Sequence, residues 1–161
     1  MIRQPAAFWR AWIPALIWLG VIAVESTDLF SSQHTGGLLY PPFHFLFGLS
    51  REQFEPWHFF LRKTGHVLAY GLLSLLLFRA WRATILRPGN PDWSRVWASV
   101  GWLMTSLVAA LDEWHQSFIP SRTGALHDVL LDSAAALAVQ LLLLFWMRGK
   151  TGRPGGGLAN A

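Results

Sequence analysis

The sequence predicts an all-α integral membrane protein: a four-transmembrane-helix bundle with an extracytoplasmic interfacial segment between helices one and two. Of its 161 residues, 53% are hydrophobic and only 14% are charged, whereas charged residues make up about a quarter of a soluble domain. A chain this short cannot readily bury so much apolar surface in one soluble core. The charged residues also lie between long apolar runs and are not spread along them.

Four apolar runs supply the predicted spans. A helix rises about 1.5 Å per residue and the hydrocarbon core is about 30 Å thick, so a span needs roughly 20 residues. The runs near this length are residues 12–30, 65–81, 96–118 and 126–147. The second run is the shortest, and the aromatic stretch at 57–61 can complete it at the membrane interface.

The first run has an alternative interpretation as a signal peptide, because Arg3 and Arg10 precede it. No A-x-A cleavage motif follows it, so we favour a retained span. This run ends in two acidic residues, Glu25 and Asp28.

The segment between the first two runs is predicted to lie against the membrane surface or to dip into it. Tyr40-Pro41-Pro42 is expected to prevent a regular helix, and residues 43–49 are too few to span a bilayer. Ser50 and Gln53 have the spacing of a capping box, which opens a short helix leading to the second span.

The basic residues predict the orientation. With a cytoplasmic N-terminus, nine Lys and Arg residues fall inside and four fall outside, which agrees with the positive-inside rule. We therefore expect a multi-pass protein of the inner (cytoplasmic) membrane with both termini cytoplasmic. Residues 1–147 form its transmembrane domain, and residues 148–161 form a basic, Gly-rich cytoplasmic tail that is predicted to be disordered.

Ionisable residues on the second and fourth helices gather at the predicted outer end. Lys63, His66 and Tyr70 fall at i, i+3 and i+7, so they share one helix face. Asp128 and Asp132 are one turn apart at the start of the fourth helix. Both helices therefore bring titratable groups to the same leaflet.

The third helix adds more polar residues near its outer end. Asp112 shares a face with His115 and Gln116, whereas Glu113 points about 100° away. Arg122 lies in the short outer hairpin that follows. Structural roles are also open to several of these residues: an outer Arg can anchor lipid head groups, and an acid in a first helical turn is favoured by the helix dipole.

The cost of charge in a membrane indicates a functional pocket. An ionised side chain in the hydrocarbon region costs about 2.5 to 3.5 kcal/mol unless it is paired or in water. Some of the excess carboxylates can hold a proton, because like charges crowd them. The predicted ligand-binding residues are Lys63, His66, Tyr70, Asp112, Glu113, Gln116, Arg122, Asp128 and Asp132, and the candidates for acid or base catalysis are Asp112, Glu113 and His66.

Metal, cofactor and nucleic-acid binding are not predicted. His66, His115, Asp112 and Asp128 are suitable ligand types, but no compact H-x-x-x-H pair supports a metal site. The chain has no Cys, so thiolate chemistry is excluded. The basic residues lie at the ends of apolar runs, where they orient the helices and do not form a nucleic-acid patch.

These motifs resemble those of the VanZ family. The resemblance covers residues 10–147 and depends on K-x-x-H-x-x-x-Y from Lys63, then D-E-x-x-Q from Asp112, followed by Pro120, Arg122 and Asp128. The family usually has Asn where this chain has Asp132, and Gly where it has Ala135. The resemblance implies a cell-envelope membrane protein, linked to glycopeptide resistance in the family's named member, the teicoplanin-resistance protein.

Several functions are compatible with the predicted pocket. It can bind or modulate an amphiphile, such as a lipid-linked cell-wall intermediate or a lipoglycopeptide, in addition to membrane lipids. Alternatively, it is an intramembrane enzyme that acts on a phospholipid or a lipid-linked phosphate or acyl group, through the cluster Lys63, His66, Asp112, Glu113 and Arg122. A silent assembly protein is a further alternative. Ion conduction is disfavoured, because the cytoplasmic half offers only isolated Thr105, Ser106 and Gln140.

Overall fold

The computed structural model describes residues 5–85 and 93–151, which contain helices and connecting turns but no strand. The helices are α1 (Pro5–Glu25), α2 (Ser32–Phe47), α3 (Arg51–Ile85), α4 (Arg95–Gln116) and α5 (Leu126–Thr151), and a short 3₁₀ turn, η1 (Asp28–Phe30), joins α1 to α2. Helix α5 continues a turn beyond the predicted boundary at residue 147. The rest of the predicted tail, from residue 152, lies outside the described residues.

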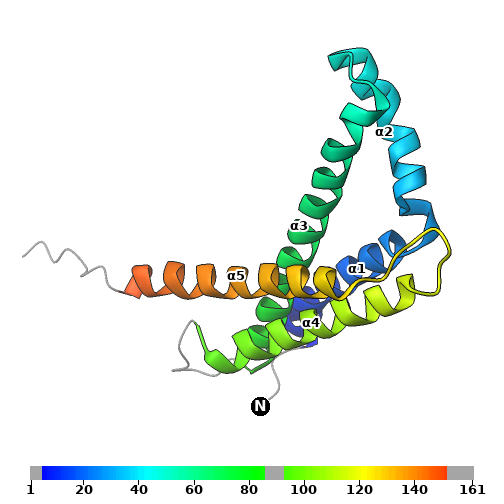
Figure 1. The fold of residues 1–161 in the computed structure, drawn as a ribbon. Helices are drawn as coiled ribbons and strands as arrows, with labels where there is room; N and C mark the ends of the chain where they lie inside the picture. The colour runs from blue at the N-terminus through cyan, green and yellow to red at the C-terminus, as the bar shows by residue number, and fades with distance from the viewer. Residues whose placement is uncertain (1–4, 86–92, 152–161) are drawn as a thin grey trace, which may run out of the picture.

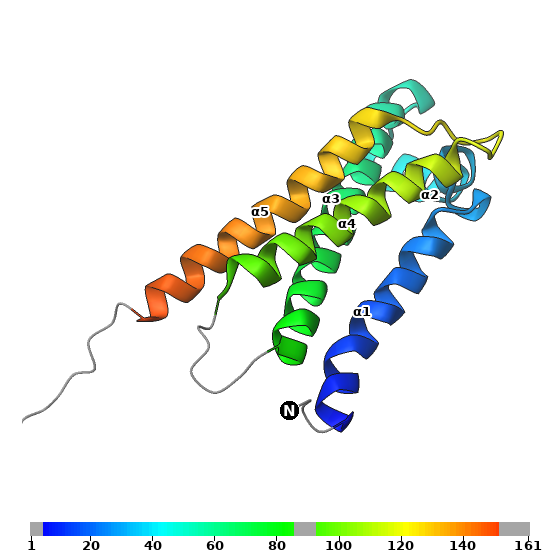
Figure 2. The ribbon, with the colours of Figure 1, turned by 90° about the horizontal axis from the view of Figure 1, so that it is seen from below.

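Helix α3 is the centre of the bundle. Its C-terminal half contacts α1 on one side and the neighbouring pair α4 and α5 on the other (Figure 2). The buried apolar residues where these helices meet form two clusters. These are Ala15, Ile22, Ala69, Tyr70, Leu73, Leu77 and Ala109 in the first, and Phe78, Trp97 and Ala98 in the second.

Many large apolar side chains also lie on the outer surface of the bundle. Large side chains of α5 point outward, with Leu142 67% exposed and Phe145 69% exposed. Helices α1, α3 and α5 are long and apolar enough to cross a membrane, over Phe8–Glu25, Arg51–Thr84 and Leu126–Arg148. The prediction of an all-helical membrane protein is therefore confirmed, while the fourth span stays a prediction.

Polar residues in the C-terminal halves of α3 and α5 contribute to helix packing. The Gln140 side-chain amide on α5 donates hydrogen bonds to the Ser74 carbonyl oxygen on α3 at 3.0 Å and to the Ser74 Oγ at 2.7 Å. The Thr105 hydroxyl donates to the Gly101 carbonyl oxygen of its own helix at 2.8 Å. The Gln140 contacts join α5 to α3, whereas the Thr105 contact stays within α4.

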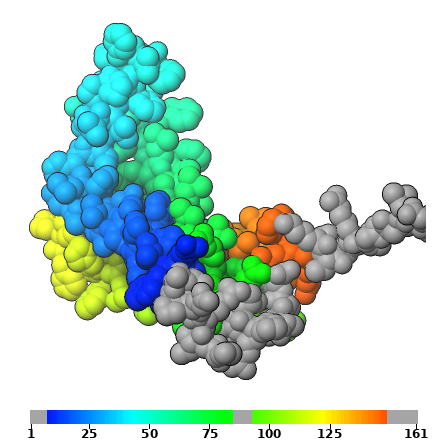
Figure 3. Space-filling view, turned by 180° about the vertical axis from the view of Figure 1, so that it is seen from behind, coloured from blue at the N-terminus to red at the C-terminus, as the bar shows by residue number. Residues whose placement is uncertain are grey.

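Helix α2 and the N-terminal half of α3 form a hairpin that projects from the rest of the bundle (Figures 1 and 3). The prediction that Tyr40-Pro41-Pro42 prevents a regular helix is wrong, because α2 continues through both prolines to Phe47. Proline φ is compatible with a helix, and its cost is a lost backbone hydrogen bond. Aromatic packing offsets that cost: the Phe54 ring on α3 lies 5.6 Å from the Tyr40 ring and 5.4 Å from the Phe43 ring, measured between centroids.

The turn between α2 and α3 matches its sequence signals. Gly48 ends α2 with a φ of 66°, a left-handed conformation that favours glycine. The Ser50 backbone N–H donates to Gln53 Oε1 at 3.0 Å and the Gln53 N–H donates to Ser50 Oγ at 3.3 Å, so the capping box is confirmed. The helix that it opens is one continuous helix of 35 residues rather than a short helix before a separate span.

Candidate functional site

The predicted site residues lie at one end of the bundle, which we call the Arg122 end: residues 26–31 after α1, residues 117–125 between α4 and α5, and the adjoining helix turns. Gly124 allows the second connection to fold back on α4, because a Cβ there would lie 2.3 Å from the Glu113 carbonyl oxygen. This close approach lets the Ala125 N–H donate to Glu113 Oε2 at 2.9 Å. The Glu113 side chain is thereby held at the inner face of the connection.

Arg122 ties this connection to the end of α1. Its Nη2 donates to the carbonyl oxygens of Glu25 at 2.5 Å and of Thr27 at 2.8 Å. The Glu25 carbonyl is one of the acceptors that the end of a helix leaves without a partner in the helix. Burial lowers the pKa of the Arg122 guanidinium, and the surrounding carboxylates, among them Asp112 and Glu113, oppose that shift. The group remains a cation, held in one position beside the site.

The three residues that share one face of α3, Lys63, His66 and Tyr70, each contact a carboxylate. Lys63 Nζ forms an ion pair with Asp128 of α5. One turn further along, His66 Nδ1 lies 3.3 Å from Asp132 Oδ2. Asp132 is almost fully buried, and its second oxygen, Oδ1, has no hydrogen-bond partner among the described residues.

The third residue on this face of α3, Tyr70, fixes Asp112. The Tyr70 hydroxyl donates to Asp112 Oδ2 at 2.7 Å, and the Gln116 side-chain amide donates to the same oxygen at 3.0 Å. The other oxygen, Asp112 Oδ1, is buried and has no hydrogen-bond partner within the described part of the chain. Asp112 therefore joins α3 to α4 from beneath the site.

A polar cavity of about 220 Å³ opens between α3, α4 and the connection that carries Arg122. We call it the main cavity, because most of the predicted site residues line it. Six of the predicted residues line it: Lys63, His66, Glu113, Gln116, Arg122 and Asp128. Tyr70, Asp112 and Asp132 do not line this cavity and lie buried behind it. Asp112 and Glu113 point in different directions, and the cavity is reached by Glu113.

Arg62 also lines this cavity, although its place in the sequence predicted only a role in orienting the protein in the membrane. It lines the main cavity and also a smaller one of about 140 Å³ that it shares with His66 and Arg122. Its Nη1 donates to the Phe30 carbonyl oxygen at 2.8 Å and to Thr35 Oγ1 at 3.2 Å. The sequence did contain a signal for this role, because Arg62 directly precedes Lys63 and both cations lie at the start of the same apolar run.

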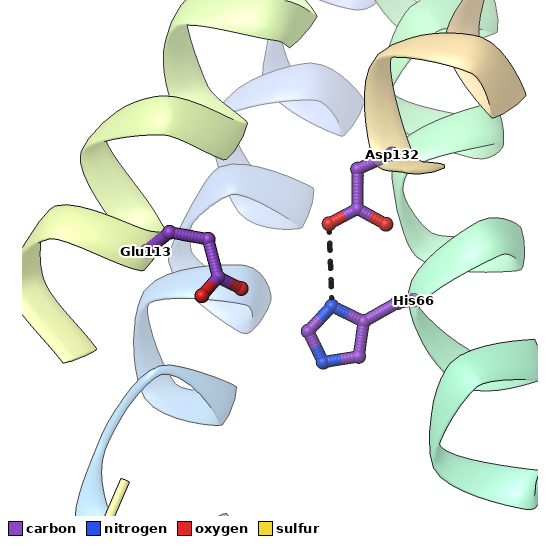
Figure 4. Close-up of side chains that lie close together, drawn as sticks. All are labelled: His66, Glu113 and Asp132. Carbon is purple, nitrogen blue, oxygen red and sulfur yellow. Dashed lines mark hydrogen bonds and ion pairs between the residues drawn. The ribbon is translucent and has the colours of Figure 1, made fainter. Parts of the chain in front are cut away.

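The metal-ligand set considered from sequence is not brought together. His115 Nδ1 forms a 2.8 Å hydrogen bond with Ser26 Oγ, and His115 lines a separate, mostly apolar groove of about 470 Å³ between α1 and α4. A different set does converge: one ligand atom each from His66, Glu113 and Asp132 lie within 4.8 Å of one another (Figure 4). All three are among the ligand-binding residues predicted from sequence, but the sequence does not group them as a metal set.

Comparison with known protein families gives a match over most of the chain. The family model described as VanZ/LLP1 matches residues 11–147, which include every residue that lines the main cavity. No curated protein matches the chain, and no solved structure matches it. The family match confirms the resemblance that the motifs from Lys63 to Asp128 predicted.

Proposed function

Because the chain belongs to the VanZ/LLP1 family, we propose that it uses the cavity at the Arg122 end to bind or modulate an amphiphilic envelope component, a lipid-linked cell-wall intermediate or a lipoglycopeptide. The observation that carries the proposal is one cavity lined by cations and carboxylates at the end of an apolar helix bundle. A polar head group beside an apolar tail is the chemistry that such a boundary recognises.

The proposal places the Arg122 end in the outer leaflet of the inner membrane, with both termini cytoplasmic. Nine Lys and Arg residues are then inside and four outside, in the direction of the positive-inside rule. We also propose α4 as the fourth span. Its 22 residues give a length of about 33 Å, and it packs against both α3 and α5.

The cations of the cavity retain donors for a ligand. Arg62 and Arg122 each have five N–H donors and Lys63 has three, and the contacts within the protein use only some of them. A phosphate or carboxylate of the ligand accepts from the remaining donors in charge-assisted hydrogen bonds. Glu113 and Asp128 on the same cavity wall suit sugar hydroxyls or an amine.

Apolar surfaces beside the cavity suit an acyl chain. Phe59 lines the cavity and is 62% exposed on the outer surface of α3. The groove between α1 and α4 is lined mostly by apolar side chains, including Ile22 and Val108, and also by Asp112. Head group and tail therefore both have surfaces of matching polarity.

Native mass spectrometry of gently extracted protein tests the proposal. We expect a polar lipid to co-purify with the wild type and to be lost from Lys63→Met, because the variant removes a cavity cation. Arg51→Gln is the matched control, since Arg51 is also an α3 cation but lies over the Tyr40 ring, outside the main cavity. Retention of the same lipid by Lys63→Met, or no bound lipid in any of the three proteins, would contradict head-group binding at this cavity.

A role in glycopeptide resistance is tested in cells. Expression in a glycopeptide-susceptible bacterium is expected to raise the inhibitory concentration of teicoplanin, whose acyl chain makes it amphiphilic, more than that of a glycopeptide without an acyl chain. The Lys63→Met variant, expressed at the same level, should lose the effect. Equal susceptibility with and without the wild-type protein rules out this role.

A further inference from the structure

Side chains with metal-ligating atoms meet where α3, α4 and α5 come together. His66 extends from α3, Glu113 from α4 and Asp132 from α5, toward a common point (Figure 4). One ligand atom from each lies within 4.8 Å of the other two. Glu113 and Asp132 are far apart in the sequence, so helix packing brings them together.

The distance between His66 and Asp132 fits a shared ion better than it fits a strong hydrogen bond. His66 Nδ1 and Asp132 Oδ2 are 3.3 Å apart, whereas charge-assisted N–H···O bonds are about 2.7 to 2.9 Å long. Zinc bonds to His nitrogen and carboxylate oxygen are about 2.0 to 2.2 Å long, which puts neighbouring ligand atoms of a tetrahedral site about 3.3 Å apart. Glu113 Oε2 accepts a hydrogen bond from the Ala125 N–H, so a rotation of the Glu113 side chain about this contact must close the remaining distance.

The charge of the cluster also favours a cation. Among the described residues, Asp112, Glu113 and Asp132 form no ion pair with a Lys or Arg, and Lys63 is engaged by Asp128. Asp132 is 1% exposed and its Oδ1 has no hydrogen-bond partner in the described part of the chain. Arg122 acts on Asp112 and Glu113 without contacting them, and Asp132 contacts only His66 among the basic residues described. Buried carboxylates that no Lys or Arg contacts are costly in a low-dielectric setting, and a divalent ion offsets that cost.

Access to the cluster comes from the cavity. His66 and Glu113 line the main cavity, whereas Asp132 lies buried behind it. An ion held by these three residues therefore keeps one side open, as the three-ligand zinc sites that accept an exogenous oxygen ligand do.

We propose that His66, Glu113 and Asp132 form a site for a divalent first-row transition-metal ion, with zinc the ion that this nitrogen and oxygen ligand set fits. The open side of the ion faces the cavity, where it can accept a phosphate or carboxylate oxygen. That last use rests on the proposed function, but the metal site itself does not.

The test is Zn²⁺ binding by the full-length protein, extracted in detergent, stripped with a chelator and studied without added lipid. We expect one Zn²⁺ per chain by isothermal titration calorimetry. Co²⁺ substituted for Zn²⁺ should give the intense visible absorption of a tetrahedral site. Because Zn²⁺ is the probe and no lipid is present, a negative result here leaves the head-group experiment unaffected, and the reverse also holds.

Variants separate a built site from adventitious binding. Asp132→Asn and Glu113→Gln keep the side-chain shape, and each should weaken Zn²⁺ binding at least about tenfold. The control is Glu55→Gln, which removes a carboxylate that lines a separate pocket beside α2 and should change binding less than twofold. Circular dichroism melting checks that each variant remains folded.

Three outcomes would overturn the proposal: no saturable Zn²⁺ binding by the wild type, affinity unchanged in both Asp132→Asn and Glu113→Gln, or equal weakening in Glu55→Gln. If a variant loses Zn²⁺ binding and also melts early, the measurement is repeated with His66→Gln. This substitution retains a polar side chain and lies on a different helix. Unchanged affinity in a folded His66→Gln variant would likewise overturn the site.

Discussion

The two ends of the bundle use buried polar residues in different ways. In the half around Gln140, polar side chains bond across helices, and the Ser74 hydroxyl in turn donates to the Ala136 carbonyl oxygen at 3.1 Å. At the Arg122 end, polar side chains surround a cavity, and buried oxygens of Asp112 and Asp132 have no hydrogen-bond partner in the described residues. Gln140 Oε1 also has no hydrogen-bond partner among the described residues, so the two ends differ in the polar cavity and not in hydrogen-bond satisfaction alone. Only at the Arg122 end do the unpartnered oxygens lie near a cavity lined by cations and carboxylates, which indicates binding.

The largest expected effect of a single substitution is at Gly124. Gly124→Val places side-chain atoms against the Glu113 carbonyl oxygen, which a Cβ alone would approach to 2.3 Å. The connection must then leave α4 and lose the Ala125 to Glu113 hydrogen bond. We expect a loss of at least about 3 kcal/mol of unfolding free energy, measured by denaturation in detergent.

Gly20→Ala is the control for this substitution, because a Cβ at Gly20 meets nothing within 4 Å. It should leave stability unchanged or raise it by up to about 1 kcal/mol, since alanine favours a helix. If Gly124→Val were as stable as Gly20→Ala, the packing of the connection against α4 would be contradicted.

A second substitution, Arg122→Ala, should detach the connection from α1. It removes hydrogen bonds from a charged donor to the Glu25 and Thr27 carbonyl oxygens, each of which contributes about 1.5 to 3 kcal/mol. We expect a loss of about 3 kcal/mol in unfolding free energy, together with loss of the bound lipid. Arg122→Lys keeps the charge but not the two-contact geometry. Its unfolding free energy should therefore lie between those of the wild type and Arg122→Ala.

The smallest effect is expected at the other end of the bundle. Gln140→Leu removes the hydrogen bonds to Ser74, and such interhelical contacts in membranes are worth about 0.6 kcal/mol on average and about 1.7 at most. Lipid and Zn²⁺ binding should remain at wild-type levels. A Gln140→Leu protein that is equally stable but fails to bind either ligand would break the distinction between the two ends.

Local signals explain which parts of the fold were predicted. Apolar runs located the segments that became α1, α3, α4 and α5, and the spacing of Ser50 and Gln53 located the start of α3. The prediction of a helix break at Pro41 and Pro42 was wrong, because packing between helices stabilises α2 there. The aromatic contacts involve Phe54, which lies on α3. Tertiary packing overrode a local preference.

The candidate site divides in the same way. Helical periodicity placed Lys63, His66 and Tyr70 on one face, and each of them meets a carboxylate. It did not pair His66 with Asp132 or bring Glu113 to them, because these residues come from three helices. A search for ligands at fixed spacing along the chain, such as H-x-x-x-H, does not find a set of this kind.

The sequence by itself determined that the chain is a helical membrane protein of the VanZ/LLP1 family, and its motifs located the candidate site residues near one end of the predicted helices. Hydropathy, helical periodicity and short motifs are local properties, and they survive in any packing of the helices. Only the tertiary structure decided that Glu113 lines the cavity while Asp112 lies behind it, that Arg62 joins the cavity wall, and which acid meets which base. Those features depend on the rotation and crossing of helices, where a difference of one residue turns a side chain by about 100°.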